Sequence, residues 1–485
     1  MILSLAAFGP RTTLVQTVQK ERPDDPLRAP GYRKYYLFTS SIDSIAQDSL
    51  QPMSNLKIVL LGTCDTKLEE TLFLREQIVR HGTANVLLLD VGRSPVQHDL
   101  IDISCTELVA AEGESEETAV DLTSLSRADY IKHVIRCATS YVSKLFRGGQ
   151  IHGIAAAGGS SGTSLATAVM RDALPVGFPK VMVSTMASGD VKPYIEETDI
   201  MLMYSVVDIA GANSILKQIL TNAAGAILGA ATAYYQGLSA RGDSNDKQAR
   251  ERRVTRVGVT MFGVTTPCVD KIRSYLESQP GFEIYVFHAT GSGGKAMERL
   301  IREKQLDAVL DITTTEVADE LVGGVLSAGP DRLAAAAQMG IPQVISVGAC
   351  DMVNFGPRHT VPSEFANPKH GRLLYEHNPV VTLMRTTPDE CARIAEFIAS
   401  KLRKYAVRPD LIHVLLPLGG ISMISTPSKP FYDPAADAAL FDGLESRLAG
   451  SGIQVTRDDR EINDSGFAIL AAKALLDLLK RRETE

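Results

Sequence analysis

The feature that most constrains the fold is a repeated alternation of short apolar runs with longer helix-like stretches. A run that is apolar at every position is typical of a strand buried on both faces of a parallel sheet. Helices between such strands then cover both faces. The runs lie at residues 57–63, 85–91, 153–159, 180–185 and 200–206, and again at 257–262, 283–288, 308–312, 343–347 and 413–418.

This pattern predicts two tandem, doubly wound (Rossmann-like) α/β domains with a cleft between them. The polar segment 236–253 separates the two sets of runs and indicates the boundary. We therefore expect a first domain at 55–240, a linker at 241–254 and a second domain at 255–485. The last helical stretch, 466–481, is amphipathic, so its apolar face should dock on a sheet.

Residues 1–54 fit neither set. Residues 21–34 are rich in proline and charge and sustain no helix or strand period. A disordered or poorly structured extension is therefore expected. A transit peptide is the alternative, which the acidic residues Glu21, Asp24 and Asp25 disfavour.

Composition excludes several functional classes. The formal net charge is −7 and no basic stripe is evident, which argues against a nucleic-acid partner. The 6 cysteines are far apart and include no Cys-x-x-Cys pair, which fits neither a zinc site nor a disulfide framework. No apolar run reaches the roughly 18 residues of a membrane span. We expect a cytoplasmic protein without membrane contact.

A glycine-rich turn follows the third apolar run, in the string GIAAAGGSSGTS (153–164). Residues 158–162, the first glycine loop, precede a helix-like stretch, so backbone N–H groups should converge on one point without side chains in the way. Such a point suits a phosphate or carboxylate. The alternative is a tight turn that only caps a helix. The spacing matches neither a Walker A loop nor the dinucleotide fingerprint, so a nicotinamide-dependent dehydrogenase is a weak third possibility.

A second candidate is Gly291-Ser292-Gly293-Gly294-Lys295, whose residues 291–294 we call the second glycine loop. It fails as a P-loop because Ala289 stands where the first glycine belongs and Ala296 follows the lysine. Further along, 351–378 is polar and is expected to be a structureless active-site loop or subunit contact. Its histidines, His359, His370 and His377, lack the spacing of a local metal motif.

Small, hydroxyl-bearing or acidic residues follow each apolar run of the first half, at 62–67, 90–92, 158–163, 184–189 and 207–208. Ligands of parallel sheets bind outside the carboxyl ends of the strands, so these segments predict one crevice for an anion. Capping and turn chemistry is the alternative. Thr66 is expected to cap a helix, Lys67 is either surface or a phosphate contact, and Asp90 holds a ribose hydroxyl or metal, or caps a turn.

Longer strings resemble one family. GTCDTK (62–67), GGSSGTS (158–164), STMASG (184–189) and SVVDI (205–209) are similar to the first domain of the plant tobamovirus-resistance family. The second half matches through GVTMFGVTTPCV (258–269), VFHATGSGG (286–294), DITTTEVAD (311–319), SVGACDMVNFGP (346–357) and LMRTT (383–387). The resemblance covers about residues 56–480.

This resemblance implies an ATP-binding region of two α/β domains in a self-associating protein, so we expect a homodimer. In the plant family this region inhibits viral RNA replication by binding the viral replication protein. Many relatives carry a further C-terminal barrel, before which this chain is expected to end, so the barrel's activity is not transferred.

By these motifs we expect ATP and Mg²⁺ as cofactors. Asp65 is the expected Mg²⁺ partner, because magnesium is usually held by one or two carboxylates plus phosphates. The expected ATP contacts, with Asp90 added for its place at a strand end, are Thr63, Asp65, Thr66, Lys67, Asp90, Gly158, Gly159, Ser160, Ser161, Gly162, Thr163, Ser184, Thr185, Ser188 and Gly189.

Two functions remain open at this point. The first is an ATP-dependent enzyme of small-molecule metabolism, with an acceptor, such as a small carboxylate, near 313–316 and 351–358. The second is a non-catalytic, nucleotide-gated module that binds another protein. No catalytic residue is identifiable from the sequence.

Overall fold

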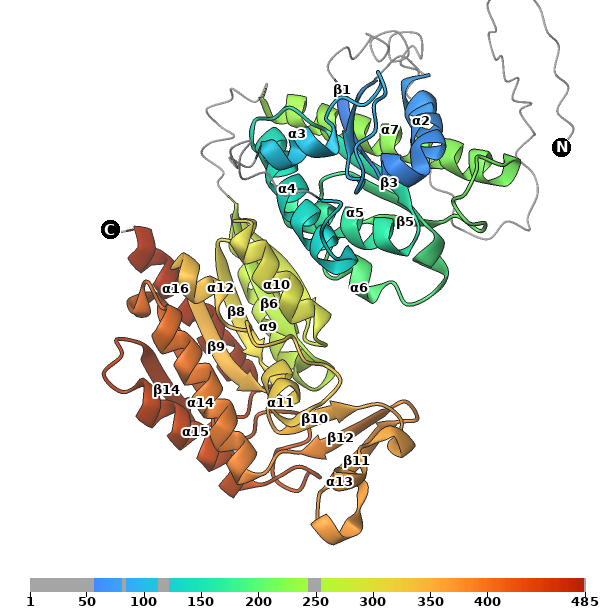
Figure 1. Cartoon of the computed structure of the whole chain (residues 1–485). Coiled ribbons are helices and arrows are strands. Elements are labelled where there is room, and N and C mark those ends of the chain that lie inside the picture. Colours follow the sequence, from blue (N-terminus) through green and yellow to red (C-terminus); the bar gives the residue numbers. More distant parts are fainter. Residues whose placement is uncertain (1–55, 81–83, 112–121, 243–253, 484–485) are drawn as a thin grey trace, which may run out of the picture. The chain divides into compact units, whose positions relative to one another are not determined.

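A computed structural model of the chain describes residues 56–80, 84–111, 122–242 and 254–483 (Figure 1). The first domain contains a parallel sheet with strand order β2-β1-β3-β4-β5. Its strands are β1 (Leu56–Gly62), β2 (Ala84–Asp90), β3 (Gly153–Gly158), β4 (Lys180–Ser184) and β5 (Met201–Tyr204).

Helices cover both faces of this sheet. They are α2 (Cys64–Val79), α3 (Cys105–Ala110), α4 (Arg127–Arg147), α5 (Ser160–Ala173), α6 (Lys192–Ile195) and α7 (Ser214–Gly242). Successive residues of β1 enter opposite cores: Ile58 and Leu60 pack with α2 and α7, whereas Val59 and Leu61 pack with α4 and α5. This two-sided burial explains why apolar residues follow one another along β1 instead of alternating with polar ones.

The second domain has a parallel sheet with strand order β14-β13-β9-β8-β6-β7. Its strands are β6 (Thr255–Met261), β7 (Phe282–His288), β8 (Ala308–Thr313), β9 (Gln343–Gly348), β13 (Ile412–Pro417) and β14 (Gln454–Asp458). The main helices are α9 (Thr266–Glu277), α10 (Ser292–Arg302), α11 (Thr315–Val322), α12 (Ala335–Met339), α14 (Pro388–Tyr405), α15 (Pro434–Leu448) and α16 (Ser465–Glu483).

Here too the helices form two layers. Val414 of β13 packs with α14 and α15, and the next residue, Leu415, packs with α9 and α16. The predicted docking of the last amphipathic helix is confirmed, because Phe467, Leu475 and their neighbours on α16 are buried against the sheet. The predicted fold class, two parallel-sheet α/β domains, is also confirmed.

The expectation that residues 351–378 are structureless is wrong. They contain β10 (Met352–Phe355), α13 (Ser363–Ala366) and β11 (Leu374–Asn378), and both strands pair antiparallel with β12 (Val381–Arg385). The sequence gives little sign of this sheet because β10 is only four residues long and β11 is mostly exposed and polar. Their pairing with β12 is a tertiary interaction.

Two predictions fall largely on residues without a described structure. The predicted extension, residues 1–54, lies outside the described residues, and so does the predicted linker apart from residues 241, 242 and 254. In the part of the chain that the structure describes, no helix combines the length and the apolar character needed to cross a bilayer.

Candidate functional site

A cavity of about 360 Å³ lies at the carboxyl edge of the first sheet. Strand β1 pairs with β2 on one side and with β3 on the other, so the loops after β1 and β3 leave the sheet in opposite directions. Open α/β sheets bind ligands at such a switch point. The cavity is lined by Thr63, Asp65, Thr66, Lys67, Arg93, Arg127, Tyr130, Gly159, Ser160, Ser161 and Gly162.

The first glycine loop forms one wall of the cavity. Helix α5 begins at Ser160, and its N-cap, Gly159, provides no side chain to bond the first-turn amides. These amides have no partner within the helix, and the helix dipole adds positive potential there. Gly158 leaves little room for a side chain, because a Cβ atom on it would lie 3.1 Å from the Cα atom of Gly162. The loop is therefore shaped to hold an anion.

Hydroxyl groups beneath the loop fix its position. The Oγ1 atom of Thr163 lies 2.6 Å from the Oγ atom of Ser184, and Ser184 Oγ accepts the amide of Met186 at 2.9 Å. Both hydroxyl residues are fully buried. They connect the loop after β3 to the turn after β4 and do not line the cavity.

The segment after β1 forms the opposite wall. Helix α2 begins at Cys64 with Thr63 as its N-cap, so the predicted N-cap role of Thr66 is wrong. The Thr66 hydroxyl instead donates to the Thr63 carbonyl at 3.4 Å. At Lys67 the backbone leaves helical geometry, with φ −135° and ψ 32°, so the first turn of α2 is distorted where it borders the cavity.

Two carboxylates meet behind this wall. Asp65 Oδ2 accepts the amides of Arg93 at 3.0 Å and Ser94 at 3.3 Å. Asp90 Oδ1 accepts the amides of Cys64 at 3.1 Å and Gly92 at 2.8 Å. A Cβ atom on Gly92 would lie 2.8 Å from Asp65 Oδ1 and 2.9 Å from Asp90 Oδ1, so only glycine fits between them.

The two carboxylates differ in access. Asp65 lines the cavity, whereas Asp90 is fully buried, and burial raises the pKa of its carboxyl group. Asp90 therefore joins the ends of β1 and β2 instead of facing the cavity. Burial likewise raises the pKa of the neighbouring Cys64 thiol, which disfavours a thiolate nucleophile there.

The other predicted residues lie in the turn after β4. Residues Thr185–Ser188 form a 3-10 helix that ends before Gly189. A Cβ atom on Gly159 would lie 3.9 Å from Thr185 Oγ1, so Thr185 borders the first glycine loop. Ser188 and Gly189 are exposed and are not part of the cavity lining.

Three lining residues escaped the sequence analysis: Arg93, Arg127 and Tyr130. The Arg127 guanidinium donates to Ser161 Oγ at 2.7 Å, and the Tyr130 hydroxyl donates to the carbonyl of Val91. Arg93 directly follows the 90–92 segment that the sequence analysis singled out. Arg127 offers a subtler signal, since a cation in the first turn of a helix opposes the helix dipole.

The cavity is lined by three cationic side chains and one carboxylate. Lys67, Arg93 and Arg127 line it together with one carboxylate, Asp65. Within the described ranges, no three His, Cys, Asp or Glu side chains lie close enough to hold a metal by themselves. A Mg²⁺ ion at this site would need the Asp65 carboxylate together with the phosphate groups of a ligand.

The second glycine loop is filled by a side chain of the protein itself. Glu316 Oε1 accepts the amides of Gly291 at 2.7 Å and Gly294 at 3.0 Å. A Cβ atom on Gly294 would lie 2.0 Å from Glu316 Oε2, so the carboxylate lies directly against the loop. It takes the place that an external anion would need.

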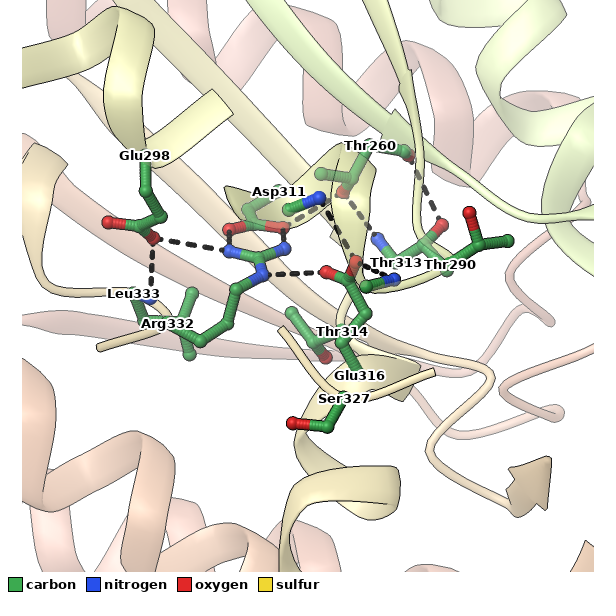
Figure 2. Close-up of polar contacts among 12 residues, drawn as sticks. Thr260, Thr290, Glu298, Asp311, Thr313, Thr314, Glu316, Ser327, Arg332 and Leu333 are labelled. Carbon is green, nitrogen blue, oxygen red and sulfur yellow. Dashed lines mark hydrogen bonds and ion pairs between the residues drawn. The ribbon is translucent and has the colours of Figure 1, made fainter. Parts of the chain in front are cut away.

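A buried arginine holds this carboxylate. Arg332 Nε donates to Glu316 Oε2 at 2.8 Å, and its Nη1 and Nη2 atoms each donate to Asp311 at 2.6 Å (Figure 2). Glu298 accepts the amides of Leu333 at 2.6 Å and Ala335 at 2.7 Å. All four charged side chains are at most 5% exposed, so the cluster is a structural core element.

Much of the region expected to hold an acceptor is buried, although Arg358 at its end is exposed. Thr313, Thr314 and Thr315 are fully buried, and the buried Asp351 accepts the Ser422 hydroxyl at 2.7 Å. Burial raises the pKa of Asp351 to about 6. His359 lies in a short 3-10 helix and His377 in β11.

Comparison with known proteins bears out the resemblance. Residues 56–236 match the N-terminal domain, and residues 254–479 the C-terminal domain, of the uncharacterised protein family UPF0261. The UPF0261 protein of Clostridium tetani is 43% identical over 428 residues, which cover 88% of this chain and 100% of that protein. A relative from Rhizobium meliloti is 43% identical over 424 residues, 87% of this chain and 99% of its own length.

The plant relatives are longer. The ToMV resistance protein Tm-1 of Solanum lycopersicum is 38% identical over 436 residues, which are 87% of this chain and 56% of the tomato protein. A solved UDP-N-acetylglucosamine 2-epimerase aligns to 60% of this chain and 79% of its own with 10% identity, and its TM-score of 0.16 is too low to bear on the fold. From the matches to both domains and the full-length bacterial alignments, the chain belongs to the UPF0261 family.

Proposed function

We propose that the first domain binds the phosphate groups of ATP, together with Mg²⁺, in the cavity at the carboxyl edge of its sheet. The observation that carries this proposal is the start of α5, where a glycine N-cap leaves the first-turn amides without a capping side chain beside a cationic cavity. Each charge-assisted hydrogen bond from such an amide to a phosphate contributes about 1.5–3 kcal/mol.

The remaining lining residues supply charge and a metal ligand. Lys67 and Arg127 stand on opposite walls, on α2 and α4, and offset the negative charge of a polyphosphate. Asp65 keeps one carboxylate oxygen for Mg²⁺ while its other oxygen accepts two backbone amides. Thr185, next to Gly159, and the exposed Ser188 and Gly189 are the proposed contacts for the rest of the nucleotide.

We propose further that the nucleotide serves an ATP-dependent reaction of small-molecule metabolism. The bacterial relatives support this, because both domains occur there over the full length of the proteins. The Clostridium and Rhizobium proteins are bacterial, so a function that they share with this chain would not depend on a plant virus. ATP consumption that depends on an added metabolite would establish it, and its absence across a broad metabolite screen would count against it.

The alternative is a non-catalytic module that binds another protein when nucleotide is present. The 38% identity to the tomato ToMV resistance protein favours this second candidate. It predicts ATP binding without turnover, and a partner recovered from a lysate only when ATP is added. Partners that do not change with nucleotide would argue against it.

The first test is calorimetric titration of ATP with Mg²⁺ into the wild type and Gly159→Asp. Gly159 has ordinary extended geometry, φ −76° and ψ −163°, and a Cβ atom on it meets nothing closer than 3.9 Å. The variant should therefore fold, while its carboxylate takes the place of the phosphate and abolishes micromolar binding.

A matched control is Gly225→Asp, which adds the same charge on α7, where a Cβ atom meets open space. This control should bind like the wild type. If the folded wild type binds no ATP, the cavity holds another anion and the ATP proposal fails.

A further inference from the structure

We propose that Arg127 binds a second phosphate group, next to the one held by the first glycine loop, and that Arg93 positions Arg127 for this contact. The site would then select di- and triphosphates over monophosphates. This inference rests on the proposed function of the same cavity and names which ligands it prefers.

Arg127 is placed at the start of α4, opposite the start of α5. Ser126 caps α4 by accepting the amide of Asp129, so Arg127 is the first helical residue. Its guanidinium reaches Ser161 Oγ, in the first turn of α5, at 2.7 Å. Two helix N-termini, each with a positive dipole end, therefore converge where this arginine lies.

This arrangement does not serve the stability of α4. A cation in the first turn of a helix is unfavourable. Among the described residues, the acceptor for the Arg127 guanidinium is the neutral hydroxyl of Ser161. One of the five guanidinium N–H groups is used in this bond, which leaves a fork suited to a phosphate. An anion bound between the starts of α4 and α5 would offset the unfavourable interaction of the Arg127 charge with the helix dipole.

Arg93 fixes the turn that leads into α4. Its guanidinium donates to the carbonyls of Leu122 at 3.2 Å, Thr123 at 2.8 Å and Leu125. Its backbone amide is held by Asp65 Oδ2 at 3.0 Å. Hydrogen bonds therefore run from Asp65 through Arg93 to the turn before α4.

The chain of contacts closes around the cavity. From the fixed turn, Arg127 reaches Ser161 of the first glycine loop. The Arg93 guanidinium already donates to three backbone carbonyls. Its proposed role is therefore to position Arg127 and not to contact the ligand itself. Within the part of the chain that the structure describes, Arg127 bonds one neutral partner, so its remaining N–H groups can contact phosphate.

The charges agree with more than one phosphate. A phosphate monoester carries about two negative charges at neutral pH, and the start of α5 with Lys67 can offset one such group. Arg127 and Arg93 add two further cations, against the single lining carboxylate Asp65. A ligand with two or three phosphate groups balances this excess better than one phosphate does.

The experiment compares wild type, Arg127→Ala and Arg127→Lys by titration with AMP, ADP, ATP and inorganic pyrophosphate. Arg127→Ala loses a charge-assisted contact, so its affinity for ADP, ATP and pyrophosphate should fall by roughly 10- to 100-fold. Its affinity for AMP should fall by less than about 3-fold. The Arg127→Lys variant keeps the positive charge but lacks the forked N–H groups of the guanidinium. Its affinities should therefore lie between those of the wild type and Arg127→Ala. The melting temperature of Arg127→Ala should stay the same or rise slightly, whereas a structural role would lower it.

Arg136→Ala is the matched control, because it removes the same charge from an exposed position of α4 outside the cavity lining. It should leave all four affinities within about 2-fold. Equal losses for AMP and ATP in Arg127→Ala, or none for either, would overturn the role of Arg127.

A double-mutant cycle tests the positioning role of Arg93. Arg93→Lys and Arg93→Ala should weaken ATP binding in the wild type, and neither should weaken it further in Arg127→Ala. Additive losses would show that Arg93 contacts the ligand by itself. Titration with pyrophosphate separates the two proposals. If the protein binds pyrophosphate but not ATP, only the proposal of a nucleotide ligand is refuted. If it binds neither, both proposals are refuted.

Discussion

The first glycine loop follows β3 and begins α5, and the second follows β7 and begins α10. Both present backbone amides at a helix start. In the first, glycine is the N-cap and a cationic cavity lies beside it. In the second, Glu316 accepts two of the amides and is itself held by Arg332.

The difference shows that the amides of a helix start need an acceptor but do not determine where that acceptor comes from. In the second domain the chain supplies its own carboxylate and buries it. In the described part of the first domain, no carboxylate caps the corresponding amides, and they border a cavity lined by cationic side chains. Four experiments follow, in order of decreasing expected effect.

The largest effect is expected for Glu316→Ala. It removes the carboxylate from the amides of Gly291 and Gly294 and one partner from the buried Arg332. Breaking a buried pair in this way should lower the free energy of unfolding by about 3–5 kcal/mol, measured by urea denaturation. Millimolar formate should restore part of the loss in the variant and leave the wild type unchanged. A variant as stable as the wild type would mean that the loop does not depend on Glu316.

The next comparison exchanges one glycine in each loop for alanine. A Cβ atom at Gly294 would lie 2.0 Å from Glu316 Oε2, so Gly294→Ala should lose about 1–3 kcal/mol of stability. A Cβ atom at Gly162 meets open space within α5, so Gly162→Ala should gain up to about 1 kcal/mol. Thermal or urea unfolding of the pair should give opposite signs. A stability loss for Gly162→Ala would contradict an open first loop.

A smaller effect concerns pH and the second domain. Burial raises the pKa of Asp319 to about 7, although it accepts two hydrogen bonds from Asn354. The folded state therefore holds a proton that the unfolded chain releases near pH 4. The stability from this group is complete at low pH and is lost as pH rises toward 7. Asp319→Asn should lose less stability than the wild type between pH 5 and pH 8 in urea titrations; parallel curves would contradict the assignment.

The smallest effect on stability is expected for Gly159→Asp, which makes the first loop resemble the second. Aspartate is a better N-cap than glycine, so the free energy of unfolding should rise by roughly a few tenths of a kcal/mol, measured by urea denaturation. Its loss of ATP binding would then be separate from any loss of fold. A destabilised variant would mean that its carboxylate does not reach the amides of α5.

The sequence determined much of the fold by itself. Continuous apolar runs are a local consequence of burial on both faces, so they placed all five strands of the first sheet and five of the six in the second. The missed strand, β14, is a half-exposed edge strand and lacks such a run. The sequence also indicated that the segments at 63–67 and 159–162 lie at one end of one sheet, where the cavity is.

The tertiary structure decided which loop is open and which side chains complete it. Arg93 and Arg127 reach the cavity through contacts 29 to 34 residues away along the chain, and Glu316 reaches the second loop from 22 and 25 residues away. Buried Ser184 and Asp90 hold the loops in place and do not line the cavity. Local sequence patterns determine strands and helix starts because these depend on neighbouring residues. The partner of a helix start is a side chain from a distant part of the sequence. Tertiary packing brings that side chain to the helix, so no local sequence pattern predicts it.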